Sequence, residues 1–149
     1  MSESKFLTDS RNMNIAIISL IILDLIMMIM GLLYVILGTF FTYHVDYIGM
    51  TASRVRSFNP KLMNLISMFI RMIGFGILSV SIGGLIIIFT GFKKREKGAW
   101  MLYLFQHLML AIPLMWITYV VGGISLILVI IGWILLIIGL ILSYKEFFK

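Results

Sequence analysis

The chain has 149 residues, of which 62% are hydrophobic and 12% are charged, whereas soluble domains carry about 25% charged residues. This composition excludes an ordinary soluble domain and predicts a single integral membrane domain with four helices of about 20 to 25 residues. No cysteine is present, which excludes disulfides and thiolate metal sites. The formal charge of +6 comes mostly from residues at the edges of apolar stretches, which indicates membrane topology rather than nucleic-acid binding.

The first apolar stretch covers about residues 13 to 38 and follows a polar segment with both signs of charge. It is longer than the roughly 7 to 15 apolar residues of a secretory signal, so we expect a retained helix. The second stretch covers about residues 60 to 89. It begins at Asn59-Pro60, where Asn can cap a helix and Pro suits the first helical position.

The third stretch covers about residues 99 to 119 and contains Pro113, which predicts a kink because proline removes a backbone hydrogen bond. The fourth covers about residues 124 to 144 and has no ionisable side chain from Ile124 to Ser143, so it suits lipid or another subunit. Only a short, uncharged turn with Gly122-Gly123 separates the last two stretches. They are therefore predicted to form an antiparallel hairpin.

The orientation is predicted from the positive residues, which are retained in the cytoplasm. Eight Lys and Arg residues lie on the side of the two termini, and three lie on the side of the first loop, at Arg54, Arg56 and Lys61. We therefore expect an all-α transmembrane bundle in the cytoplasmic (plasma) membrane, with both termini in the cytoplasm.

Ionisable residues stand near the middle of the first three stretches: Asp24, Arg71 and His107. A central Asp or Arg costs roughly 2.5 to 3.5 kcal/mol in a membrane, so these groups are expected to satisfy one another. Counting about 1.5 Å per residue from the expected helix starts places all three near the midplane. Asp24 and Arg71 form the expected ion pair, because opposite charges at one depth relieve each other's desolvation. Additional polar side chains on the same helix faces complete the predicted cluster: Tyr103, Gln106 and Asn64.

Three interpretations of this cluster stay open. In the first, the cluster is a structural clamp that fixes helix order. In the second, it is a proton-linked or polar-ligand site of the kind that carriers use, and in the third, it contacts a partner protein. Glycine pairs seven residues apart, such as Gly31 with Gly38, Gly76 with Gly83 and Gly132 with Gly139, favour close helix packing.

Basic residues precede the third stretch and indicate topology, with an anionic lipid headgroup as the alternative ligand. They are Lys93, Lys94, Arg95 and Lys97. In the first loop, His44 and Asp46 supply two metal-capable side chains where a site needs three or four, so no metal site is predicted.

Two segments carry a resemblance to a known kind of protein: Asn59-Pro60 to Arg71 and Gly74, and Gly91-Phe92-Lys93-Lys94-Arg95-Glu96-Lys97-Gly98-Ala99-Trp100. With them the chain resembles small prokaryotic four-span membrane proteins of uncharacterised function. Those proteins show Arg-x-x-Gly in the second helix and a basic Glu-Lys-x-Ala-Trp turn before the third. The resemblance implies a four-span bundle in which Arg71, Glu96, Lys97 and Trp100 belong to the common framework. Asp24 and His107 are not part of that pattern.

These observations predict a small non-enzymatic protein without a cofactor, which acts as an accessory or structural subunit of a larger membrane complex. The alternative is an oligomeric carrier or ligand-binding bundle that uses Asp24, Arg71 and His107. A third hypothesis is a membrane enzyme on a lipid or isoprenoid, with His107 and Asp24 as acid and base. An enzyme of that kind requires an enclosed apolar cavity that touches His107.

Overall fold

A computed structural model describes residues 10 to 148, and its regular elements are helices. Two short helices, α2 and α3, and a π-helical turn, η1, accompany four long helices. Each long helix has the length and apolar composition to cross a membrane, and the second of these candidate spans includes η1. The prediction of an all-α, four-helix membrane bundle is therefore confirmed. The elements are α1 (Arg11–Leu37), α2 (Thr42–Ile48), α3 (Ala52–Phe58), α4 (Pro60–Ile87), η1 (Ile88–Phe92), α5 (Lys97–Val121) and α6 (Gly123–Phe147).

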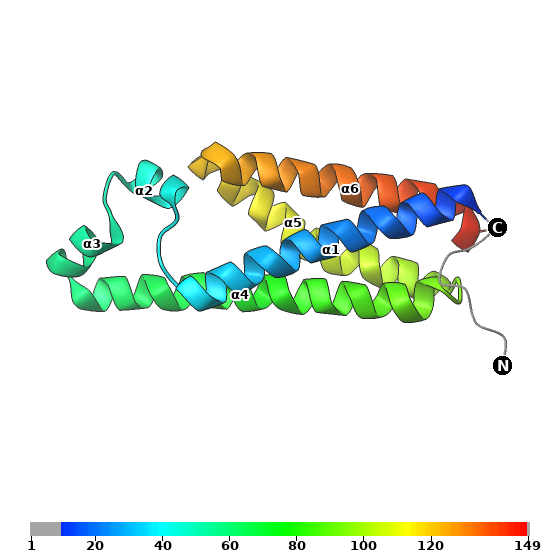
Figure 1. The fold of residues 1–149 in the computed structure, drawn as a ribbon, viewed down its shortest axis with the longest axis horizontal. Coiled ribbons are helices and arrows are strands. Elements are labelled where there is room, and N and C mark those ends of the chain that lie inside the picture. Colours follow the sequence, from blue (N-terminus) through cyan, green and yellow to red (C-terminus); the bar gives the residue numbers. More distant parts are fainter. Residues whose placement is uncertain (1–9, 149) are drawn as a thin grey trace.

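The four long helices form a ring in which α1 packs against α4 and α6, and α5 packs against the same two helices. The start of α1 and the end of α6 lie together at one end of the bundle, which we call the terminal end (Figure 1). At the opposite end, the α2–α3 end, α4 extends past α1 and carries α3 on its first turns (Figure 1). The predicted hairpin is present, since only Gly122 separates α5 from α6.

Helix boundaries follow local signals in the sequence. The Asn59 side chain accepts a hydrogen bond from the Leu62 amide at 3.1 Å and caps α4, with Pro60 in the first helical position. At its other end, α4 continues beyond the predicted boundary as η1. The helix α5 continues through Pro113 without a break, and the kink at this residue stays a prediction.

The main core lies in the half of the bundle near the terminal end. There, one face of α1 meets aromatic residues of η1, α5 and α6, and Gly139 of α6 leaves the space that Leu20 occupies. The fourth apolar stretch is therefore a packing partner of α1 as well as a lipid-facing helix. The most deeply buried apolar members are Met13, Ile17, Leu20, Phe92, Tyr103 and Phe147.

The backbones of α1 and α4 approach each other closely at Gly31 and Gly74. A Cβ atom added to Gly74 would lie 2.9 Å from the Gly31 carbonyl oxygen. The other predicted glycine of that face, Gly38, has a different role: it ends α1 in the left-handed conformation, with φ of 54°. Gly76 has no neighbour within 4 Å of an added Cβ, so it is not a packing glycine.

Candidate functional site

A buried hydrogen-bonded cluster joins α1 to α5 across the centre of the bundle. Asp24 is 0% exposed and His107 is 2% exposed. The Oδ1 atom of Asp24 lies 2.9 Å from Nε2 of His107, and Oδ2 accepts a hydrogen bond from the Tyr103 hydroxyl at 3.0 Å. The rings of Tyr103 and His107 stack with centroids 4.0 Å apart. Every charged or polar tip in this cluster therefore has a partner.

The hydrogen bonds of His107 limit where its protons are. Nδ1 lies 2.9 Å from the Tyr103 carbonyl oxygen, and because a carbonyl only accepts, Nδ1 carries a hydrogen. Nε2 then either accepts from a protonated Asp24 or donates, as an imidazolium, to the Asp24 carboxylate. Both arrangements hold one shared proton and have no net charge, which suits the pair to the interior of a membrane.

Space for the Asp24 carboxylate is provided by Gly84 of α4. A Cβ atom at this position would lie 2.6 and 2.7 Å from the two carboxylate oxygens. The glycine thus lets α4 cover the pair, which explains how a carboxylate can be fully buried between three helices.

The expected Asp24–Arg71 ion pair is wrong. The Arg71 guanidinium donates instead to the Val35 carbonyl oxygen near the end of α1 and lies beside Gly38. Ser67, one turn earlier on α4, donates to the Gly38 carbonyl at 2.6 Å. Arg71 and Ser67 therefore satisfy carbonyl groups at the C-terminus of α1, where positive charge is favourable.

Asp24 and Arg71 do not meet because of the register in which the antiparallel helices α1 and α4 pack. The expectation placed Pro60 at the membrane surface, but α4 begins beyond the end of α1 (Figure 1). Gly84, not Arg71, lies opposite Asp24. Positions 71 and 84 are 13 residues apart, or about 20 Å along the helix, so Arg71 is far from the Asp24–His107 pair.

The two amide side chains of the predicted cluster lie elsewhere. Gln106 donates to the Val80 carbonyl of α4 at 2.6 Å and packs over Gly83. Asn64 is exposed on the part of α4 that extends past α1. Of the six residues predicted to meet, the structure brings Asp24, Tyr103 and His107 together.

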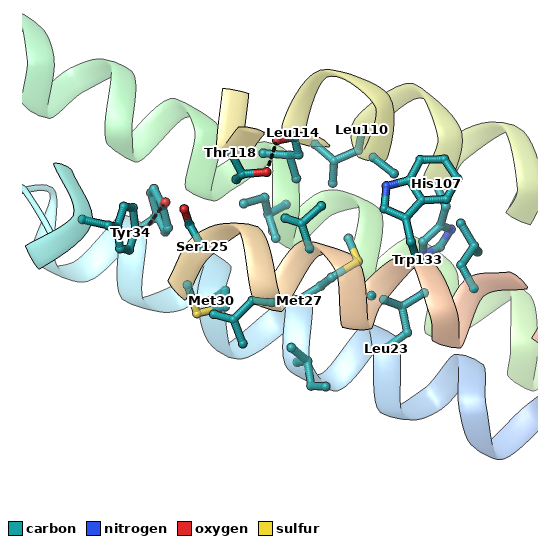
Figure 2. A pocket seen from close by; sticks show the side chains of 18 residues that line it. Leu23, Met27, Met30, Tyr34, His107, Leu110, Leu114, Thr118, Ser125 and Trp133 are labelled. Atoms are coloured by element: carbon teal, nitrogen blue, oxygen red, sulfur yellow. Dashed lines mark hydrogen bonds between the residues drawn. The ribbon is translucent and has the colours of Figure 1, made fainter. Parts of the chain in front are cut away.

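A cavity of about 120 Å³ adjoins this cluster on the side of the α2–α3 end. His107 and Trp133 lie at one extremity and Tyr34 at the other (Figure 2). Leu, Met, Ile and Ala side chains form most of the wall. The lining residues of α5 run from His107 to Thr118, three helical turns or about 16 Å. The cavity is therefore long, narrow and largely apolar.

The indole of Trp133 places a hydrogen-bond donor in this wall. Within residues 10 to 148, its Nε1 atom is the one buried side-chain nitrogen or oxygen without a hydrogen-bond partner, and Figure 2 shows the nitrogen turned into the cavity. A buried, unpartnered donor costs about 1 to 3 kcal/mol. By contrast, the buried indole of Trp100 donates to the Ser143 hydroxyl at 3.0 Å. Sequence reasoning missed this feature of Trp133, because it depends on how four helices pack.

Hydroxyl groups mark the other extremity of the cavity. The Tyr34 and Tyr43 oxygens lie 2.5 Å apart, and Tyr43 belongs to α2, which covers this end. Burial, together with the adjacent Tyr34 hydroxyl, raises the pKa of Tyr43, so the Tyr43 hydroxyl stays protonated. Thr118 and Ser125 line the same region, and both donate to backbone carbonyls.

The basic turn before α5 is tied to its own chain. Arg95 forms an ion pair with Glu146 at 3.1 Å, Lys94 lies 3.8 Å from Glu96, and the Lys97 ammonium lies 5.8 Å from the centre of the Phe148 ring. The contacts of Arg95 and Lys97 fasten the α4–α5 connection and the start of α5 to the end of α6, whereas the Lys94–Glu96 contact lies within the connection. Binding of a lipid headgroup by this turn, Lys93 included, stays a prediction.

The loop residue His44 has a structural role. Its Nδ1 atom accepts a hydrogen bond from the Phe41 amide at 3.1 Å and completes the cap of α2. Across residues 10 to 148, no three His, Asp or Glu side chains lie close enough together to hold a metal ion.

Comparison of the chain with protein-family models, curated proteins and solved structures finds no match. The site is therefore interpreted from its own geometry. The resemblance to small four-span prokaryotic proteins stays a prediction.

Proposed function

We propose that this multi-pass membrane protein binds a small apolar molecule in the cavity between α1, α5 and α6. The observation that carries the proposal is the cavity itself, with its apolar wall and a polar group at each extremity. A cavity of about 150 Å³ lined by apolar side chains can hold benzene. One of about 120 Å³ therefore suits about five or six non-hydrogen atoms, or a segment of one longer chain.

The Asp24–His107 pair stands at one extremity of this site. Only His107 of the pair belongs to the cavity wall, and its two ring nitrogens are already bonded to Asp24 and to the Tyr103 carbonyl. The pair therefore holds α5 against α1 and fixes the shape of the cavity. It does not present Asp24 and His107 together to a substrate atom, which acid-base chemistry of the third hypothesis requires.

The test uses the methyl signals of Met27 and Met30, which line the cavity, against Met109, which is 78% exposed on the lipid side of α5. Protein labelled with ¹³C-methyl methionine is titrated with hexane in detergent micelles. The proposal predicts saturable shifts at Met27 and Met30 and only a gradual, unsaturated drift at Met109.

A matched variant sharpens the test. Ala111 lines the cavity, so Ala111→Leu should fill part of it, abolish the saturable shifts and raise the thermal unfolding temperature. Saturable shifts that persist in this variant, or parallel behaviour of all three methionines in the original protein, would contradict binding in the cavity.

The role of an accessory subunit in a larger complex remains a prediction, as do self-association, a plasma-membrane location and cytoplasmic termini. Purification from the native membrane in mild detergent tests the first. A stoichiometric set of other membrane chains would support it, and recovery of this chain by itself would contradict it.

A further inference from the structure

We infer that the ligand carries a neutral hydrogen-bond acceptor, a carbonyl or ether oxygen, which accepts from the Trp133 indole N–H. This inference rests on the proposed function and specifies the chemical class of its ligand. An indole nitrogen is a donor only, so it can recognise an acceptor and nothing else. Its position in the mostly apolar wall, at the extremity beside His107, makes it the anchor of that end of the site (Figure 2).

The lining of the cavity excludes ligands with a negatively charged oxygen group. Among residues 10 to 148, no Lys or Arg lines the cavity, and both ring nitrogens of His107 are bonded, to Asp24 and to the Tyr103 carbonyl. A carboxylate or phosphate would therefore enter without a counter-charge, which is unfavourable in an apolar site. The acceptor must be uncharged.

A hydroxyl group fits this extremity less well than a carbonyl or ether. A hydroxyl that accepts from Trp133 still has its own hydrogen to donate, and the nearby Asp24 is outside the wall and already bonded to His107 and Tyr103. Carbonyl and ether oxygens bring no such hydrogen. The remaining atoms of the ligand then follow the apolar wall toward the hydroxyls of Tyr34 and Ser125 (Figure 2).

The test compares two molecules of similar size, 2-hexanone and hexane, at equal mole fractions in detergent micelles. The protein is labelled with ¹⁵N in the indole groups, and Trp133→Phe assigns the signal. We expect 2-hexanone to move the Trp133 indole proton downfield with saturation, whereas hexane does not. Trp100, which is bonded to Ser143, and Trp116, which is 71% exposed to lipid, are internal controls and should show no saturable shift.

Affinity provides a second measurement. Followed at the Met27 and Met30 methyl groups, 2-hexanone should bind about tenfold more tightly than hexane, which corresponds to one net hydrogen bond. Trp133→Phe keeps an aromatic ring and removes the donor, so it should reduce this ratio to about one.

The outcomes separate the inference from the function on which it rests. Saturable methyl shifts with both molecules, without a downfield indole shift for the ketone, would overturn the acceptor and leave the proposed function standing. Absence of saturable methyl shifts with either molecule would overturn both. The indole measurement uses the unmodified sequence. When Trp133→Phe does not fold, Trp100→Phe and Trp116→Phe assign the other two of the three indole signals and leave that of Trp133.

Discussion

Nε2 of His107 lies 2.9 Å from Oδ1 of Asp24, and both side chains are almost completely buried between α1, α4 and α5. This contact and the hydrogen bond from the Tyr103 hydroxyl to Asp24 cross the ring from α1 to α5, whose main packing partners are α4 and α6. The first prediction concerns what the contact requires, a charge or a set of hydrogen bonds.

Asp24→Asn should reduce the free energy of unfolding by about 1 kcal/mol or less, because an amide can donate to neutral His107 and accept from Tyr103. Asp24→Ala leaves both partners unsatisfied and should cost about 3 to 5 kcal/mol. Unfolding in mixed micelles with increasing SDS measures both variants. Equal losses for the two substitutions would show that the negative charge itself is required.

Gly84→Ala should destabilise the bundle by about 1 to 3 kcal/mol, because the added methyl group would meet the Asp24 carboxylate at 2.6 Å. Gly76→Ala is the matched control on the same helix, where an added Cβ has nothing within 4 Å. It should leave stability unchanged or raise it slightly, since alanine favours a helix more than glycine does. The same unfolding assay compares them, and similar losses at both positions would refute the close approach of α4 to Asp24.

Arg71→Gln should cost about 1 kcal/mol through the lost hydrogen bond to the Val35 carbonyl. Its effect should add to that of Asp24→Asn within about 0.5 kcal/mol, because the two sites are well separated and share no partner. A double-mutant cycle measures this. A coupling energy above about 1 kcal/mol would contradict the separation of the two sites and support an Asp24–Arg71 ion pair.

The cap of α2 should weaken in acid. Burial lowers the pKa of His44 below its ordinary value of 6.5, so the folded state favours the neutral ring, whose Nδ1 accepts from the Phe41 amide. The resulting stability is present above pH 6.5 and is lost as the pH falls through the lowered pKa. Amide exchange of α2, corrected for the intrinsic pH dependence, should therefore show less protection at pH 5 than at pH 7.5.

His44→Gln is the control for this effect, because glutamine at the third helical position can make the same capping contact without titrating. The pH dependence of protection should disappear in the variant. If it persists, another group controls the opening of α2.

The sequence was sufficient for the four spans, because long apolar stretches separated by polar or glycine-containing turns leave few other structures in lipid. It also placed Asp24 and His107 in one polar cluster, since an ionisable group at mid-depth needs a partner, but it gave Asp24 the wrong partner, Arg71. The partner assigned to Arg71 was wrong because helix length does not reveal how far α4 extends past α1. The cavity and the free N–H of Trp133 depend on side chains from several helices, and no local pattern records them.

The most direct test of ligand binding in the cavity is mass spectrometry of small molecules retained by the protein after purification from its native membrane. The original sequence and Ala111→Leu are purified in parallel, so that lipids on the outer surface are common to both. We predict a neutral, mostly apolar molecule with an acceptor oxygen that the original protein retains and the variant lacks. Identical sets of molecules in the two samples would contradict the account.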